Sequence, residues 1–92
     1  MKILENIFAS KTQAKLLNLF FTNPNQRIYQ RELAAKTNES LGSIQYELKR
    51  LKEIGLITAQ KEKRKVYYSL NKEFYLYPQI RDIIIKTAQK NL

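Results

Sequence analysis

The 92-residue chain contains no cysteine and no histidine. Their absence excludes disulfides, thiol nucleophiles, imidazole acid–base catalysis and zinc sites built from sulfur or imidazole ligands. The eight carboxylates are scattered, and most lie near a lysine or arginine in the sequence. We therefore predict that the protein is not an enzyme and holds no metal or cofactor.

Long apolar runs are also missing. None approaches the ~18–20 residues that a membrane span requires. The opening MKILENIFAS is interrupted by Glu5 and Asn6, whereas a secretory signal needs roughly 7–15 apolar residues in succession. We expect a cytoplasmic protein without membrane contact. Residues 1–92 allow a single domain with a modest core, to whose stability a partner subunit could contribute.

Positive charge is in excess: 17 Lys and Arg stand against 8 Asp and Glu, a formal net charge of +9. Such an excess favours polyanionic partners, because each neutralised phosphate releases condensed counterions. Many small proteins carry basic surfaces for solubility alone. Composition therefore leaves nucleic acid as one of two alternatives, and the distribution of the charge must decide between them.

The N-terminal third predicts two helical segments and a short extended one. Residues 2–8 form a short amphipathic helical turn, and Ser-Lys-Thr-Gln at residues 10–13 is a capping box that begins a longer helix. That helix must end before Pro24, which disfavours helix on its N-terminal side. Residues 27–29 are predicted to be extended.

Two consecutive helices with a sharp turn between them follow. Residues 30–37 predict a helix of two turns, after which Asn38 can adopt the left-handed conformation of a tight turn. Ser40 is a good N-cap for the next helix, which continues to about Ile54 and ends at Gly55 in the position after the helix.

The C-terminal third predicts a hairpin and a last helix. Strands over residues 56–60 and 66–70 enclose a charged segment, residues 61–65, and a helix begins near Pro78. The main apolar face of that helix consists of Ile80, Ile83, Ile84 and Thr87. The order of elements predicts a mainly α winged helix-turn-helix with a small β-hairpin wing.

On these residues the chain resembles the winged helix-turn-helix transcriptional regulators of the ArsR/MarR-like group. The resemblance covers residues 10–87 and depends on RELAAKTNES, GSIQYELKRLKEIGLI and VYYSLN. It implies that residues 40–54 form a DNA-recognition helix and that the next hairpin is the wing. The metal ligands of the metal-sensing members are absent. Tyr29, Asn38 and Glu39 replace the usual capping residue, turn glycine and apolar residue, and the wing tip has no glycine.

The recognition helix carries two faces. Ile44, Leu48 and Leu51 recur at helical spacing and define a buried side. The other side begins with small and hydrogen-bonding side chains, which suit close approach to base edges, and the helix N-terminus offers N–H groups to a phosphate. An ordinary solvated helix can carry similar residues. The candidate DNA-binding residues here are Ser40, Leu41, Gly42, Ser43, Gln45, Tyr46, Lys49 and Arg50.

The wing concentrates positive charge beside that helix, although such a run can also be a merely solvated face. Its residues are Lys61, Glu62, Lys63, Arg64 and Lys65. By the resemblance, Lys63, Arg64 and Lys65 contact the flanking backbone, with Arg64 the best candidate for the minor groove. Gln30 and Arg31, at the start of the preceding helix, are further candidate phosphate contacts.

The two ends of the chain predict an interface between two copies. Residues 1–9 and 78–92 carry apolar side chains beyond what the main core face needs, although a monomer could bury them itself. The candidate dimer residues are Ile3, Leu4, Ile7, Phe8, Ile85, Ala88 and Leu92. We predict a homodimer. Phe74, Tyr75 and Tyr77 are expected to be structural, covering the seam between the wing and the last helix.

The sequence thus favours a regulator that reads double-stranded DNA. The main alternative is a winged-helix protein-interaction module that does not read DNA. RNA binding ranks third, because Tyr46 is the one obvious exposed aromatic platform. The sequence does not identify a small-molecule effector or an operator sequence, or whether the protein represses or activates transcription.

Overall fold

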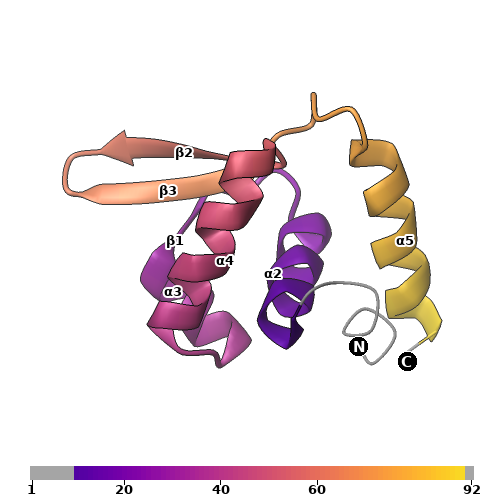
Figure 1. Cartoon of the computed structure of the whole chain (residues 1–92), viewed down its shortest axis with the longest axis horizontal. Coiled ribbons are helices and arrows are strands. Elements are labelled where there is room, and N and C mark those ends of the chain that lie inside the picture. Colours follow the sequence, from indigo (N-terminus) through magenta and orange to yellow (C-terminus); the bar gives the residue numbers. More distant parts are fainter. Residues whose placement is uncertain (1–9, 91–92) are drawn as a thin grey trace.

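The computed structural model describes residues 10–90, which form helices and a small sheet of short strands (Figure 1). The elements are α2 (Lys11–Thr22), β1 (Ile28–Tyr29), α3 (Gln30–Thr37), α4 (Leu41–Ile54), β2 (Ile57–Glu62), β3 (Lys65–Leu70) and α5 (Tyr77–Lys90). This order confirms the predicted winged helix-turn-helix. The helical turn predicted over residues 2–8 lies outside the described residues.

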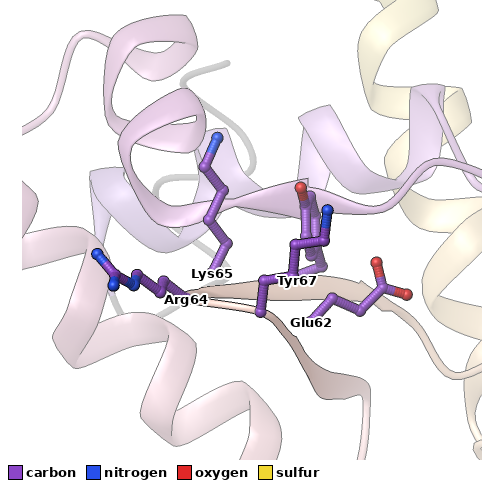
Figure 2. A pocket seen from close by; sticks show the side chains of 5 residues that line it. Glu62, Arg64, Lys65 and Tyr67 are labelled. Atoms are coloured by element: carbon purple, nitrogen blue, oxygen red, sulfur yellow. The ribbon is translucent and has the colours of Figure 1, made fainter.

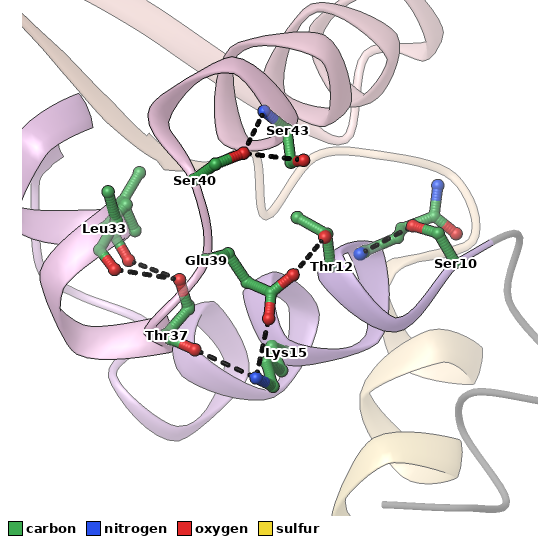
Figure 3. Close-up of polar contacts among 10 residues, drawn as sticks. Ser10, Thr12, Lys15, Leu33, Thr37, Glu39, Ser40 and Ser43 are labelled. Carbon is green, nitrogen blue, oxygen red and sulfur yellow. Dashed lines mark hydrogen bonds and ion pairs between the residues drawn. The ribbon is translucent and has the colours of Figure 1, made fainter.

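The two predicted N-caps are present. The Ser10 hydroxyl accepts a hydrogen bond from the Gln13 backbone N–H at 3.0 Å, at the start of α2. The Ser40 hydroxyl accepts one from the Ser43 N–H at 3.1 Å, at the start of α4 (Figure 3). Each bond satisfies one of the N–H groups that a helix leaves without an internal partner.

The turns after α3 and α4 use left-handed residues, as predicted. Asn38 ends α3 with φ 56°, and Gly55 ends α4 with φ 91°. The Leu56 N–H then donates to the Leu51 carbonyl at 3.1 Å, which is the hydrogen bond of a Schellman motif. Leu56 therefore completes the end of α4, whereas the sequence predicted that the strand begins there.

The three strands form one antiparallel sheet in the order β1-β3-β2. The wing hairpin extends farther than predicted: Glu62 pairs with Lys65, so Lys63 and Arg64 alone form the turn. Lys63 takes the left-handed conformation, φ 56°. It lies at the wing tip, where the sequence has no glycine. The prediction of a five-residue loop was wrong, because the two strands remain paired along residues whose charged side chains are exposed.

The core surrounds α2, which lies between α5 on one side and α3 and α4 on the other (Figure 1). Its largest fully buried side chains are Leu16, Leu17, Phe20, Ile28, Leu33, Ile44, Leu48, Leu56, Ile57 and Ile84. None of the helices among residues 10–90 is both long and apolar enough to cross a membrane.

One prediction for α5 was wrong. Ile84 is fully buried and Ile80 packs against the core, but Ile83 remains 39% exposed. Residues four apart, such as Ile80 and Ile84, lie on the same side of a helix, whereas Ile83 is rotated toward its edge. Among the described residues, α2 is the one helix that packs against α5, so the covered stripe is narrower than predicted.

Candidate nucleic-acid interface

Helix α4, predicted to be the recognition helix, has the two faces that the sequence predicted. Ile44, Leu48 and Leu51 are buried in the core. Their opposite face is exposed along the whole helix, with Tyr46 60% exposed. The exposed candidates are Ser40, Leu41, Gly42, Ser43, Gln45, Tyr46, Lys49 and Arg50. An added Cβ at Gly42 would meet nothing within 4 Å, so the helix start is open to close approach.

Glu47 anchors this helix to α2. Its side chain is buried, and its two carboxylate oxygens accept hydrogen bonds from the Ser10 hydroxyl at 2.6 Å and from Gln13 Nε2 at 3.3 Å. A buried carboxylate needs such partners, since an unpaired one would be strongly destabilising. These contacts hold α4 with its opposite face outward.

Two candidates on that face touch each other. The Arg50 guanidinium lies 5.6 Å from the centroid of the Tyr46 ring, within the range of a cation–π contact. Because these residues are one helical turn apart, the contact keeps both side chains along the outer face of α4.

A chain of hydrogen bonds joins α4 to the wing strand β3. Gln45 Nε2 donates to Gln30 Oε1 at 3.2 Å, and Gln30 Nε2 donates to the Tyr68 hydroxyl at 3.0 Å. Tyr68 is buried in the central strand β3, opposite Ile28 of β1. The start of α3 therefore connects the exposed face of α4 to the sheet.

An ion pair between Arg27 and the wing occupies the one carboxylate of the hairpin. Arg27 Nη1 and Nη2 donate to the two carboxylate oxygens of Glu62 at 2.6 and 3.0 Å. Hydrogen bonding to this guanidinium lowers the pKa of Glu62, and the same contact raises the pKa of Arg27. Arg64 and Lys65 extend away from the Glu62 carboxylate (Figure 2). The single acid of the wing is thus occupied by a residue outside the hairpin.

Two aromatic rings of the same surface pack against cationic side chains. Lys65 Nζ lies 4.5 Å from the centroid of the Tyr29 ring, and the Arg27 guanidinium lies 4.8 Å from that of Tyr67. The two rings meet edge to face, with centroids 6.0 Å apart. The contact with Tyr29 restricts the Lys65 side chain and so lowers the entropy that it would lose on binding an anion.

A hollow joins the wing to the start of α3. It is lined by Tyr29, Gln30, Arg31, Arg64, Lys65 and Val66. Since Gln30 also bonds to Gln45, a continuous surface runs from α4 across the start of α3 to the wing tip. The hairpin projects from the side of the molecule that carries α3 and α4, away from α5 (Figure 1).

Glu39 fastens the turn of the helix-turn-helix to α2. Its carboxylate accepts hydrogen bonds from Thr12 Oγ1 at 2.6 Å and from Lys15 Nζ at 2.7 Å, and Lys15 also donates to the Thr37 carbonyl at 3.0 Å (Figure 3). Lys15 and then Thr12 lower the pKa of Glu39 by hydrogen bonding. The acid where the family usually has an apolar residue is therefore structural.

Replacing Glu39 by glutamine is expected to cost about 1 kcal/mol of unfolding free energy at pH 7, because a charge-assisted, partly exposed contact is weakened. The folded-state pKa of Glu39 lies below its unfolded value of about 4.3, so its contribution is present above that pH and is lost as the pH falls through the lowered folded value. Urea unfolding at several pH values should show the gap between the two proteins closing below about pH 4. A gap that persists in acid would contradict this, and exposed Glu53→Gln is the control.

Several contributing residues were not singled out in the sequence. Arg27, Tyr67 and Tyr68 act through partners 33 to 40 positions away in the chain. The only local signal is the alternation of β3, which places Tyr68 on the face opposite Tyr67. No feature of the sequence indicated that Arg27 pairs with Glu62.

The predicted interface at the chain ends is only partly visible. Ile85 is half-buried on α5, whereas Ile3, Leu4, Ile7, Phe8 and Leu92, and the side chain of Ala88, lie outside what the structure describes. Phe74 and Tyr77 pack against the core, and Tyr77 lies 5.2 Å from Phe21 between ring centroids. Tyr75 was expected to cover the seam as well, but it is 78% exposed.

No protein-family model matches the chain, and no curated protein matches it in sequence. Solved structures do share its fold. MepR, a transcription regulator of the Staphylococcus aureus multidrug efflux pump MepA, has a TM-score of 0.71 at 16% identity, over 97% of this chain and 67% of MepR. The adhesin competence repressor AdcR of Streptococcus pyogenes has a TM-score of 0.74 at 22% identity, over 95% of this chain and 63% of AdcR.

A point mutant of Lactococcus lactis ZitR has a TM-score of 0.71 at 23% identity, over 91% of this chain and 56% of ZitR. MepR has also been solved as a mutant bound to an oligodeoxyribonucleotide. At this level of identity the likeness establishes the fold, which is that of winged-helix regulators. The chain spans 56% to 67% of the length of these three proteins.

Proposed function

We propose that this protein is a transcriptional regulator of the ArsR/MarR-like group that binds double-stranded DNA by sequence, in the cytoplasm. Helix α4 enters the major groove, and the wing lies on the flanking backbone or in the minor groove. One observation carries the proposal: the exposed face of α4, the start of α3 and the basic wing form one continuous surface, in which the only wing carboxylate is paired with Arg27.

The residues of that surface divide into those that contact base edges and those that bind phosphates. Gly42, Ser43 and Gln45 occupy the exposed start of α4, where small and amide side chains reach base edges. The cationic side chains are placed around them, so they bind the phosphates on either side of the groove. They are Arg31, Lys49, Arg50, Lys63, Arg64 and Lys65.

We further propose that two copies associate through the terminal helices. A two-fold dimer would place its two recognition helices in successive major grooves, about 34–36 Å apart. Exposed apolar side chains near α5 support a contact on this side, which is the side away from the wing (Figure 1). They are Tyr75, Leu76 and Ile83.

The same apolar residues favour a second candidate function. In a protein-interaction module, Tyr75, Leu76 and Ile83 would be the working surface, and the basic wing would be incidental. Substituting Ile83 by a charged residue would then abolish the activity, whereas substituting Gln45 would leave it intact. The DNA-binding proposal expects the effect of Gln45 on base preference to be the larger one.

Selection from a random pool of duplex DNA at moderate salt tests the proposal directly. Enrichment of an inverted repeat with half-sites about one helical turn apart supports both the DNA reader and the symmetric dimer. A single short site retains the reader and rejects that dimer geometry. Weak, salt-sensitive binding without enrichment rejects sequence reading and favours the interaction module.

Replacing Gln45 or Tyr46 by alanine is expected to reduce discrimination at a contacted base pair by about 1–3 kcal/mol. The physical reason is the loss of hydrogen bonds or apolar contacts to one base edge, which other base pairs do not share. Titration of the selected duplex against its single-base-pair variants measures this. A uniform loss on all duplexes would mean that these residues contact phosphate instead.

A further inference from the structure

The chain of hydrogen bonds between Tyr68, Gln30 and Gln45 has a direction. Gln30 is an amide with a donor end and an acceptor end. Its donor end faces the Tyr68 hydroxyl at 3.0 Å, so its acceptor end faces Gln45 at 3.2 Å. Gln45 must therefore turn one Nε2 proton inward. This arrangement joins α3 and α4 to strand β3, where Tyr68 lies 38 positions after Gln30.

Burial makes the inner end of this chain the fixed one. Tyr68 is 8% exposed and belongs to the central strand of the sheet, where a hydroxyl needs a partner. Gln30 is half-buried and Gln45 is exposed. The buried Tyr68 in the central strand therefore orients Gln30 at the start of α3. Gln30 in turn orients Gln45 on the exposed face of α4.

The direction determines what Gln45 presents to a ligand. With one Nε2 proton given to Gln30, its amide retains one N–H donor and the Oε1 acceptor side by side. That pair matches the N7 acceptor and N6 donor of adenine in the major groove. If the chain ran the other way, Tyr68 would donate to Gln30, Gln45 Oε1 would face inward, and its two N–H groups would match the N7 and O6 acceptors of guanine.

We propose that Gln30 and Tyr68 are specificity-determining positioning residues, which orient the Gln45 amide so that it reads adenine rather than guanine. This inference rests on the proposed function, namely that α4 lies in the major groove. It gives Gln30 a role other than the phosphate contact expected from the sequence.

Two substitutions at Gln30 separate orientation from packing. In Gln30→Glu the carboxylate only accepts hydrogen bonds, so it holds Gln45 in the orientation of the structure. In Gln30→Lys the ammonium only donates, so it attracts Gln45 Oε1 and reverses the amide. The two variants also change the net charge, but charge affects all duplexes alike. The measured quantity is therefore the ratio of dissociation constants for A·T and G·C at the base pair that Gln45→Ala identifies.

We expect an A·T preference there for the natural protein and for Gln30→Glu, and a preference reduced about fivefold or more in Gln30→Lys and in Tyr68→Phe. Tyr67→Phe is the matched control, since it removes a hydroxyl from the same strand outside the hydrogen-bond chain. An unchanged ratio in all Gln30 and Tyr68 variants overturns the inference alone, and so does a G·C preference in the natural protein. A natural protein without any base preference overturns the proposed function as well.

A second measurement needs no DNA. Nitrogen-15 relaxation of the side-chain amides in the free protein should show the Gln45 Nε2 group ordered in the natural protein and in Gln30→Glu. In Tyr68→Phe it should become as mobile as an ordinary exposed glutamine amide. If Gln45 is equally mobile in all three proteins, the hydrogen-bond chain does not orient it, whatever the protein binds.

Discussion

Replacing Arg64 and Lys65 together by alanine is expected to weaken binding to every DNA duplex by about 60-fold at 0.1 M monovalent salt. Each phosphate contact contributes about 0.9 to the slope of the logarithm of the binding constant against the logarithm of salt concentration. Two lost contacts therefore make the slope shallower by about 1.8, and the loss in affinity grows as salt falls below 1 M.

The structure explains why these two side chains carry so large an effect. Both are exposed and line the hollow between the wing and α3. Glu62, the acid nearest to them in sequence, is held by Arg27 at 2.6 Å, so neither cation needs to break an ion pair with Glu62 before it meets a phosphate. Lys65 is further restrained over the Tyr29 ring.

A matched pair of substitutions controls for net charge. Arg81 and Lys86 are exposed on α5, the helix farthest from the wing in Figure 1. Arg81→Ala with Lys86→Ala removes the same two charges and should leave the salt slope nearly unchanged. Titrations at several salt concentrations compare the two double variants. A change in base preference in the wing variant, at constant slope, would show that the wing reads sequence instead of holding the backbone.

Replacing Leu48 by alanine is expected to lower the free energy of unfolding by about 2–5 kcal/mol. Leu48 is 1% exposed and lies on the buried side of α4, so truncation removes packing contacts and leaves a cavity that its neighbours fill only in part. Domains of this size have total stabilities of about 5–15 kcal/mol. The variant should therefore unfold at a temperature well below the melting temperature of the natural protein. Urea unfolding measures the difference.

The adjacent residue provides the control. Lys49 follows Leu48 in the same helix but is exposed on the face opposite the core. Lys49→Ala should change the unfolding free energy by no more than about 0.5 kcal/mol, while it weakens DNA binding and makes the salt slope shallower by about 0.9. If Leu48→Ala were as stable as Lys49→Ala, α4 would not be held against the core as the structure shows.

The helix-turn-helix itself was predictable because its signals are local. Ser40 and Ser43 make the cap within four residues, and Asn38 and Gly55 take the left-handed conformations that helix ends require. Capping and backbone conformation depend on neighbours in the sequence, so they can be recognised without tertiary structure. The outer face of α4 followed from the spacing of Ile44, Leu48 and Leu51.

The predictions that were wrong concern contacts between distant segments. Ile83 was assigned to the core, but α2 does not cover that edge of α5. The wing loop was predicted too long, because the register of a hairpin depends on pairing across strands and not on the polarity of its side chains. The pairing of Glu62 with Arg27, 35 positions away, was likewise not indicated by the sequence.

By itself, the sequence determined the order of the helices and strands, the buried and exposed faces of α4, and the absence of cysteine and histidine chemistry. Composition, caps and helical periodicity are properties of single residues and their near neighbours. Only the tertiary structure decided which cations of the wing are free, and that Tyr68 and Gln30 bond in a chain to Gln45. Hydrogen bonds and ion pairs require atoms within about 3 Å, and folding alone brings together residues that lie 30 or more positions apart.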